Sequence, residues 1–173
     1  MKFRMPSSFI TTLILAAIFM VFINMAVCEA QKGSAKEYKQ DSSISAYDDD
    51  TVLDKKSNLM WAKYDNGTDI NWTDAKKYCE QYRLGGYKDW RLPTKDELAS
   101  LYDTKKSYQT PCGSTVHTTK LIEISCSSLW SSETRGSGET AEAAFFQFSS
   151  GKRLWYLQSN PFYGRALPVR STR

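Results

Sequence analysis

A basic start followed by a long apolar run decides how much of this 173-residue chain can take part in a folded domain. Two basic residues among the first four precede an apolar run from Phe9 to Val27, and small residues follow it around Ala30. This order is typical of a secretory signal peptide. We therefore expect residues 1–30 to be removed during export, which leaves Gln31 as the first residue of a periplasmic, secreted or cell-surface protein.

Two other interpretations of this segment remain open. The apolar run is almost long enough to span a bilayer, so an uncleaved segment would anchor the protein in the inner membrane. Lipidation of Cys28 is the third interpretation, although Val27 is larger than the residue that usually precedes a lipidated cysteine. The whole sequence has a net charge of only +4, and removal of residues 1–30 changes this charge little. The mature chain is therefore only mildly basic. Mild charge and export both argue against a nucleic-acid partner.

The polar segment that follows has little to bury. Residues 31–50 lack an apolar period and predict a flexible linker. Order is expected from Thr51, so that residues 51–173 form one domain. Short strands are predicted at 51–53 and 59–61, with Asn58 in a left-handed turn conformation between them.

Two helices are expected next. Asn71 is placed to cap the first helix, which we expect to end at Gly85 and Gly86. Thr94 and Glu97 form a capping box at the start of the second helix. After a long polar loop over residues 104–128, the pattern changes to strands at 129–132, 143–148, 153–157 and 165–171. Cys112 and Cys126 lie inside the loop, where a disulfide would tie it down.

Several blocks of the sequence resemble the Lcl C-terminal domain family of bacterial exported domains, whose function is unknown. They are NLMWAKYDNG, INWTDAKKYCEQYRLGGYKDWRLPTKDELASL, LWSS, FFQFSSGKRLWY and VRSTR. The resemblance covers roughly residues 50–173. It implies an α+β, C-type-lectin-like fold similar to that of sulfatase-modifying factors, with two helices packed on a small twisted antiparallel sheet and a long loop region.

One position departs from the family pattern. Members commonly carry a cysteine where this chain has Ser171, and that cysteine is placed to pair with the one on the first helix. The resemblance therefore implies that Cys79 has no such partner here. We expect a Cys112–Cys126 disulfide, with Cys79 as a buried free thiol.

Within the matching blocks we expect structural roles, as core side chains or hydrogen-bonding groups. The residues concerned are Trp61, Trp72, Gly85, Gly86, Asp89, Trp90, Arg91, Leu92, Pro93, Glu97, Trp130 and Arg170.

The chain offers little for catalysis. His117 is the only histidine, so a catalytic triad or a histidine metal cluster is not predicted. Asp96 and Glu97 are neighbours on a helix and do not face each other. We expect no cofactor and no metal, and we predict a non-enzymatic recognition module for glycans or another exported protein. The alternative is an enzyme or modifying factor related to sulfatase-modifying proteins.

The C-terminal segment is the candidate ligand site. After Gly151 it has five basic residues and no acidic one, interleaved with aromatic residues. If Leu154 and Tyr156 face the core, strand alternation turns Arg153 and Trp155 outward. Such a surface suits an anionic glycan, although a solubilising basic edge with inward-packed aromatics is the simpler alternative. The candidate ligand-binding residues are Lys152, Arg153, Trp155, Phe162, Tyr163 and Arg165.

Overall fold

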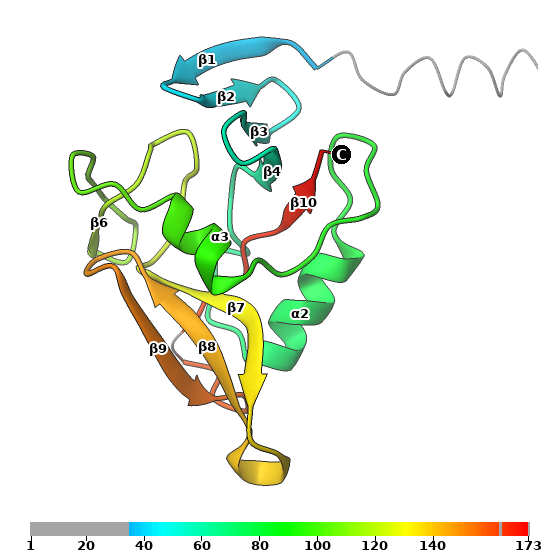
Figure 1. Ribbon diagram of the computed structural model, residues 1–173, viewed down its shortest axis with the longest axis vertical. Helices are drawn as coiled ribbons and strands as arrows, with labels where there is room; N and C mark the ends of the chain where they lie inside the picture. Colours follow the sequence, from blue (N-terminus) through cyan, green and yellow to red (C-terminus); the bar gives the residue numbers. More distant parts are fainter. Residues whose placement is uncertain (1–34, 163, 173) are drawn as a thin grey trace, which may run out of the picture. The chain divides into compact units, whose positions relative to one another are not determined.

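A computed structural model of the protein describes residues 35–162 and 164–172. The expected signal peptide, its cleavage site and Tyr163 lie outside the described residues. Within the described part of the chain, no helix has the length and apolar character needed to cross a membrane. The fold is α+β, as predicted, but the strands divide among three antiparallel sheets instead of one (Figure 1).

The largest sheet has five strands in the order β1-β2-β3-β4-β10. They are β1 (Glu37–Asp41), β2 (Ile44–Tyr47), β3 (Thr51–Asp54), β4 (Leu59–Ala62) and β10 (Val169–Ser171). The predicted strand pair around Asn58 is confirmed, and this residue has the expected left-handed backbone with φ of 55°. Because β10 pairs with β4, the two ends of the family-like region meet in one sheet.

The flexible linker predicted over residues 31–50 is wrong for most of the described part of that segment. Residues 37–47 form the β1–β2 hairpin, and β2 pairs with β3 through Ser45 and Leu53. Ser45 and Ala46 are buried in the sheet. The pattern did not reveal these strands because the hairpin is held mainly by backbone pairing, and Ala46 is its only fully buried apolar residue.

The first helix, α2 (Trp72–Gln81), begins as predicted, with the Asn71 side chain accepting a hydrogen bond from the backbone N–H of Asp74. It buries Ala75 and Cys79. The helix ends at Gln81, before the expected Gly85-Gly86 pair, because Tyr82 already has extended backbone angles.

The second helix, α3 (Lys95–Ser100), has the predicted capping box between Thr94 and Glu97. The Arg91 guanidinium donates to both carboxylate oxygens of Glu97, at 2.8 and 2.6 Å. Burial opposes ionisation of Glu97, but the hydrogen bonds from Arg91 and Thr94 outweigh it and lower the pKa of the carboxyl below its ordinary 4.5.

Glu97→Gln should therefore lower the free energy of unfolding by about 1–2 kcal/mol at neutral pH, because it removes a charge-assisted hydrogen-bond pair. A carboxyl with a lowered pKa stabilises the fold above its ordinary pKa and loses this contribution as pH falls. The difference between parent and variant should thus shrink below about pH 4.5. Urea unfolding at a series of pH values measures it. The exposed Glu80, which pairs with Lys76 on α2, provides the Glu80→Gln control with little expected effect.

A three-stranded sheet contains β7 (Ser128–Arg135), β8 (Glu142–Gln147) and β9 (Lys152–Leu157), with β8 in the middle. A short 3-10 turn, η1 (Gly138–Thr140), precedes β8, and a turn through Gly151 joins β8 to β9. Inside the long loop, β5 (Tyr108–Gln109) pairs with β6 (Thr115–Val116). Helix α3 packs against β7 and β8, and α2 packs against β7.

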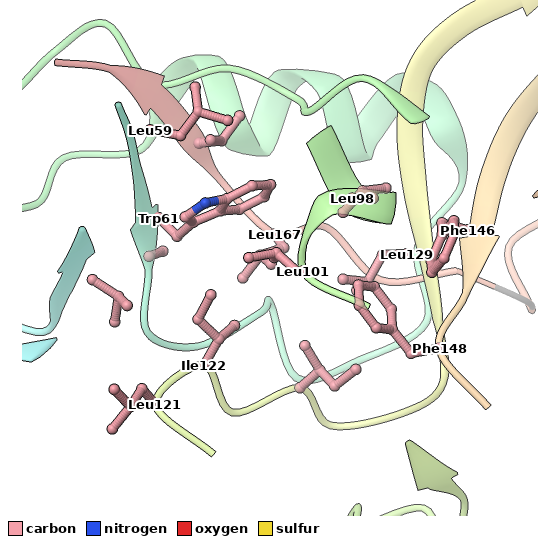
Figure 2. Packing of buried hydrophobic residues seen from close by; sticks show 14 of the residues in the cluster. Leu59, Trp61, Leu98, Leu101, Leu121, Ile122, Leu129, Phe146, Phe148 and Leu167 are labelled. Atoms are coloured by element: carbon pink, nitrogen blue, oxygen red, sulfur yellow. The ribbon is translucent and has the colours of Figure 1, made fainter. Parts of the chain in front are cut away.

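The main hydrophobic core joins the large sheet, α3, the long loop and the three-stranded sheet. Trp61 projects from β4 toward α3, where Leu98 and Leu101 lie (Figure 2). Leu121 and Ile122 bring the long loop into the same core, and both are buried. The loop is therefore anchored from inside the domain.

A second cluster lies between α2 and the three-stranded sheet, around Trp130. The indole N–H of Trp130 donates to the carbonyl of Ile70 at 2.7 Å, and the ring of Phe145 lies edge-on at 5.8 Å. The backbone of Gly164 approaches the indole so closely that no side chain would fit at this position.

Trp90 is also buried, and the Trp72 indole N–H donates to the carbonyl of Ser131. Arg170 forms an ion pair with Asp89 at 2.8 Å and lies over the ring of Tyr87. Most blocks that carry the family resemblance thus contribute to packing or to hydrogen bonds.

Candidate functional site

The candidate ligand-binding residues of the C-terminal segment occupy opposite edges of the three-stranded sheet. Lys152, Arg153 and Trp155 lie on β9, at one edge. Arg165 is bridged to Leu129 of β7, at the other. The structure therefore does not bring the predicted basic residues into one patch.

Two of these basic residues, Arg153 and Arg165, have charged partners within the domain. Arg153 forms an ion pair with Asp96 at 2.7 Å. Arg165 pairs with Asp69 and donates to the Ser125 hydroxyl, and only 11% of its side chain is exposed. Arg165 therefore fastens a loop to the sheet.

The aromatic residues of that segment are arranged differently from the expectation. Leu154 and Tyr156, whose burial would have turned Trp155 outward, are 37% and 36% exposed. Trp155 is half-buried and lies beneath two cations, Lys95 at 4.7 Å and Arg135 at 4.5 Å from its ring centre. Phe162 is 72% exposed. Strand β9 lies at the edge of its sheet, and side chains on both of its faces are accessible to solvent.

The long loop is held by the predicted disulfide. Cys112 and Cys126 are bonded, with their Cα atoms 5.3 Å apart, and Cys79 is a buried free thiol, so this prediction is confirmed. Burial raises the pKa of the Cys79 thiol far above its ordinary value, which makes it a poor nucleophile. The Tyr108 hydroxyl adds a second clamp, donating to the carbonyl of Ile122 and accepting from the backbone N–H of Ile124.

A wide hollow of about 1070 Å³ lies beside this clamped loop. Tyr64 and Tyr108 line it, together with Lys39, Lys120 and the peptide backbone next to Cys112. Tyr64 is 43% exposed and presents an aromatic side chain to solvent.

A second hollow of about 490 Å³ adjoins the first and is lined by four lysines. These are Lys39, Lys105, Lys106 and Lys120. Lys39 and Lys120 line both hollows, so the two are neighbours on the surface, and we call the pair the lysine–tyrosine groove.

The acidic residues at this groove are largely occupied. Asp41 accepts hydrogen bonds from the Lys106 ammonium and the Thr119 hydroxyl, both at 2.6 Å, and these hold the pKa of Asp41 below its ordinary value. The buried Asp65 accepts from the backbone N–H groups of Gly67 and Ser125. Glu123 also lines the first hollow, with 53% of its side chain exposed, and pairs with Lys63 at 3.8 Å. Beside these three engaged carboxylates, the groove presents four lysines and two tyrosines to a ligand.

His117 lines neither of the two hollows. His117 is half-buried, with its Nδ1 atom 3.2 Å from the carbonyl of Lys106. Among residues 35–162 and 164–172, no group of three His, Cys, Asp or Glu side chains could hold a metal ion.

Sequence reasoning missed the groove. The sequence places Lys105, Lys106 and Lys120 in the long polar loop and Lys39 in the expected linker, and its pattern does not connect the two segments. The Lys105-Lys106 pair was the available signal, but it gained meaning only when β1 was found beside the loop.

The fold and the groove define a small disulfide-bonded α+β domain with a loop-lined surface site. The model of the Lcl C-terminal domain family matches residues 50–170, which is more than half of the chain, and the chain belongs to this family. No curated protein matches the chain.

Proposed function

We propose that this protein is an exported, non-catalytic recognition module that binds an anionic glycan in the lysine–tyrosine groove. The observation that carries the proposal is the meeting of four lysines with the exposed Tyr64 in adjoining hollows. Ammonium groups pair with sulfate or carboxylate groups, while an aromatic ring covers the apolar side of a sugar. The groove thus replaces the C-terminal basic segment as the candidate site.

The support of the groove is consistent with this proposal. The disulfide and the Tyr108 clamp hold the loop that carries Lys105, Lys106 and Lys120. A loop fixed in advance loses less conformational entropy when a ligand binds. A disulfide also suits a protein that works outside the cytoplasm. We infer further that the domain is C-type-lectin-like, because its helices flank small antiparallel sheets and a long clamped loop carries the site.

Binding to dextran sulfate, with uncharged dextran as the reference, tests the proposal. Replacing both Lys105 and Lys120 with Ser should weaken binding by roughly 3- to 30-fold at low salt, from the usual worth of exposed ion pairs. Tyr64→Ala should weaken binding as well, whereas Tyr64→Phe should retain most of it. Titration calorimetry measures the affinities, and added salt should lower the parent's affinity steeply.

The matched control replaces Lys152 and Arg153 of β9 with Ser, which removes two charges outside the groove. We expect this variant to bind almost as well as the parent. If it loses affinity while the groove variants do not, the C-terminal segment is the site and the proposed groove is wrong. Absence of binding by the parent at low salt would overturn the function itself.

A further inference from the structure

We propose that the β1–β2 hairpin is a specificity element of the groove, which favours glycans with closely spaced anionic groups. This inference rests on the proposed function and extends it to the kind of ligand selected. The family model begins at residue 50, so the hairpin over residues 37–47 precedes the matched region. It is nevertheless an integral part of the domain.

Backbone pairing fixes the position of the hairpin. Ile44, Ser45 and Ala46 of β2 pair with Asp54, Leu53 and Val52 of β3. In Figure 1 the end of β1 points toward the side on which β6 and its loops lie. The hairpin is therefore held in place as the outer part of the five-stranded sheet.

Two residues of β1 act on the lysine–tyrosine groove. Lys39 lines both hollows and so supplies one of the four lysines. Asp41 bonds to Lys106 and to Thr119, which are 65 and 78 residues away in the sequence. The hairpin thus contributes one cation directly and holds a second in place.

A third contact brings the hairpin to the aromatic part of the groove. The Lys63 ammonium lies 5.7 Å from the ring centre of Tyr38 on β1 and 4.8 Å from that of Tyr64. Without the hairpin, the groove would keep Tyr64, Tyr108 and the loop lysines but lose Lys39 and the anchor of Lys106. A ligand with widely spaced anionic groups would then lose little affinity, whereas a ligand with closely spaced anionic groups would lose the ion pair that Lys39 provides.

Two dextran sulfates of high and low sulfate content serve as probes. The parent should prefer the densely sulfated form. Lys39→Ser should lower affinity for that form by about 2- to 5-fold, which is the order expected for one exposed ion pair, and change affinity for the sparse form less. The matched control is Lys36→Ser, because Lys36 precedes β1, is exposed and lines neither hollow. It should keep the parent's preference.

The outcomes separate this inference from the function on which it rests. If the Lys105 and Lys120 variant loses binding while Lys39→Ser behaves like Lys36→Ser, the hairpin inference is wrong and the groove stands. If the parent binds neither dextran sulfate at low salt, both fail. A reduced preference in Lys39→Ser, with the melting temperature unchanged, supports the hairpin as the selecting element.

Discussion

Replacing Trp130 with alanine is expected to lower the free energy of unfolding by about 3–5 kcal/mol, the usual range for a buried aromatic side chain. Trp130 is completely buried and packs between Phe145 and the backbone of Gly164. Alanine would leave a cavity at this point, and the carbonyl of Ile70 would lose its hydrogen bond. Both losses act on the contact between the three-stranded sheet and the segment that leads into α2.

Urea unfolding monitored by far-UV circular dichroism measures this effect. Phe162→Ala is the control, because Phe162 is largely exposed, and it should change stability by no more than about 0.5 kcal/mol. If Trp130→Ala does not fold, Trp130→Phe retains part of the ring and should give a smaller, measurable loss. A Trp130→Phe variant as stable as the parent would contradict the packing described here.

Loss of the Cys112–Cys126 disulfide should have the second large effect. The bond joins cysteines that are 14 positions apart in the sequence, and in the chain-entropy account such a cross-link is worth about 3 kcal/mol. Replacing both cysteines with Ser, or reducing the parent, should therefore lower the unfolding midpoint by similar amounts. Affinity for dextran sulfate should fall as well, since the closed loop carries Lys120 and is continuous with the segment that carries Lys105 and Lys106.

The double Ser variant is its own control for the reductant, because it no longer has the bond. Reductant should leave its unfolding midpoint unchanged, which separates loss of the disulfide from any effect at Cys79. An unchanged midpoint for the reduced parent would show that Tyr108 and the buried loop residues hold the segment by themselves.

Features decided by neighbouring residues were predicted well from the sequence. The cap at Asn71, the capping box of Thr94 and Glu97 and the left-handed Asn58 depend on residues at most three positions apart. Local chemistry was sufficient for each of these three features. The Cys112–Cys126 pair was predicted on other grounds: the expected export, the position of both cysteines in the long loop and the departure from the family pattern at Ser171.

Features decided by distant pairing were missed. The β1–β2 hairpin exists because β3 is available to pair with β2, and its own residues carry no apolar alternation. The groove combines Lys39 with lysines more than 60 residues later in the chain. For Arg165 the sequence predicted a grouping that the fold does not form. Its position in the C-terminal segment suggested one surface with the basic residues of β9, but in the structure it pairs with Asp69.

The hairpin has a consequence for how the domain meets other polypeptides. A sheet edge with unpaired backbone groups can template pairing with another chain, and charged residues and bulges protect against it. In this protein the outer strand is β1, which is mostly exposed, carries Glu37 and Lys39 and has a bulge between them. A chain cut to residues 50–170 would instead end its sheet at β3, whose Thr51 and Val52 are buried in the whole domain. The hairpin thus replaces a boundary of buried residues with a charged one, and by this principle residues before the family region protect that edge of the sheet from pairing with another chain.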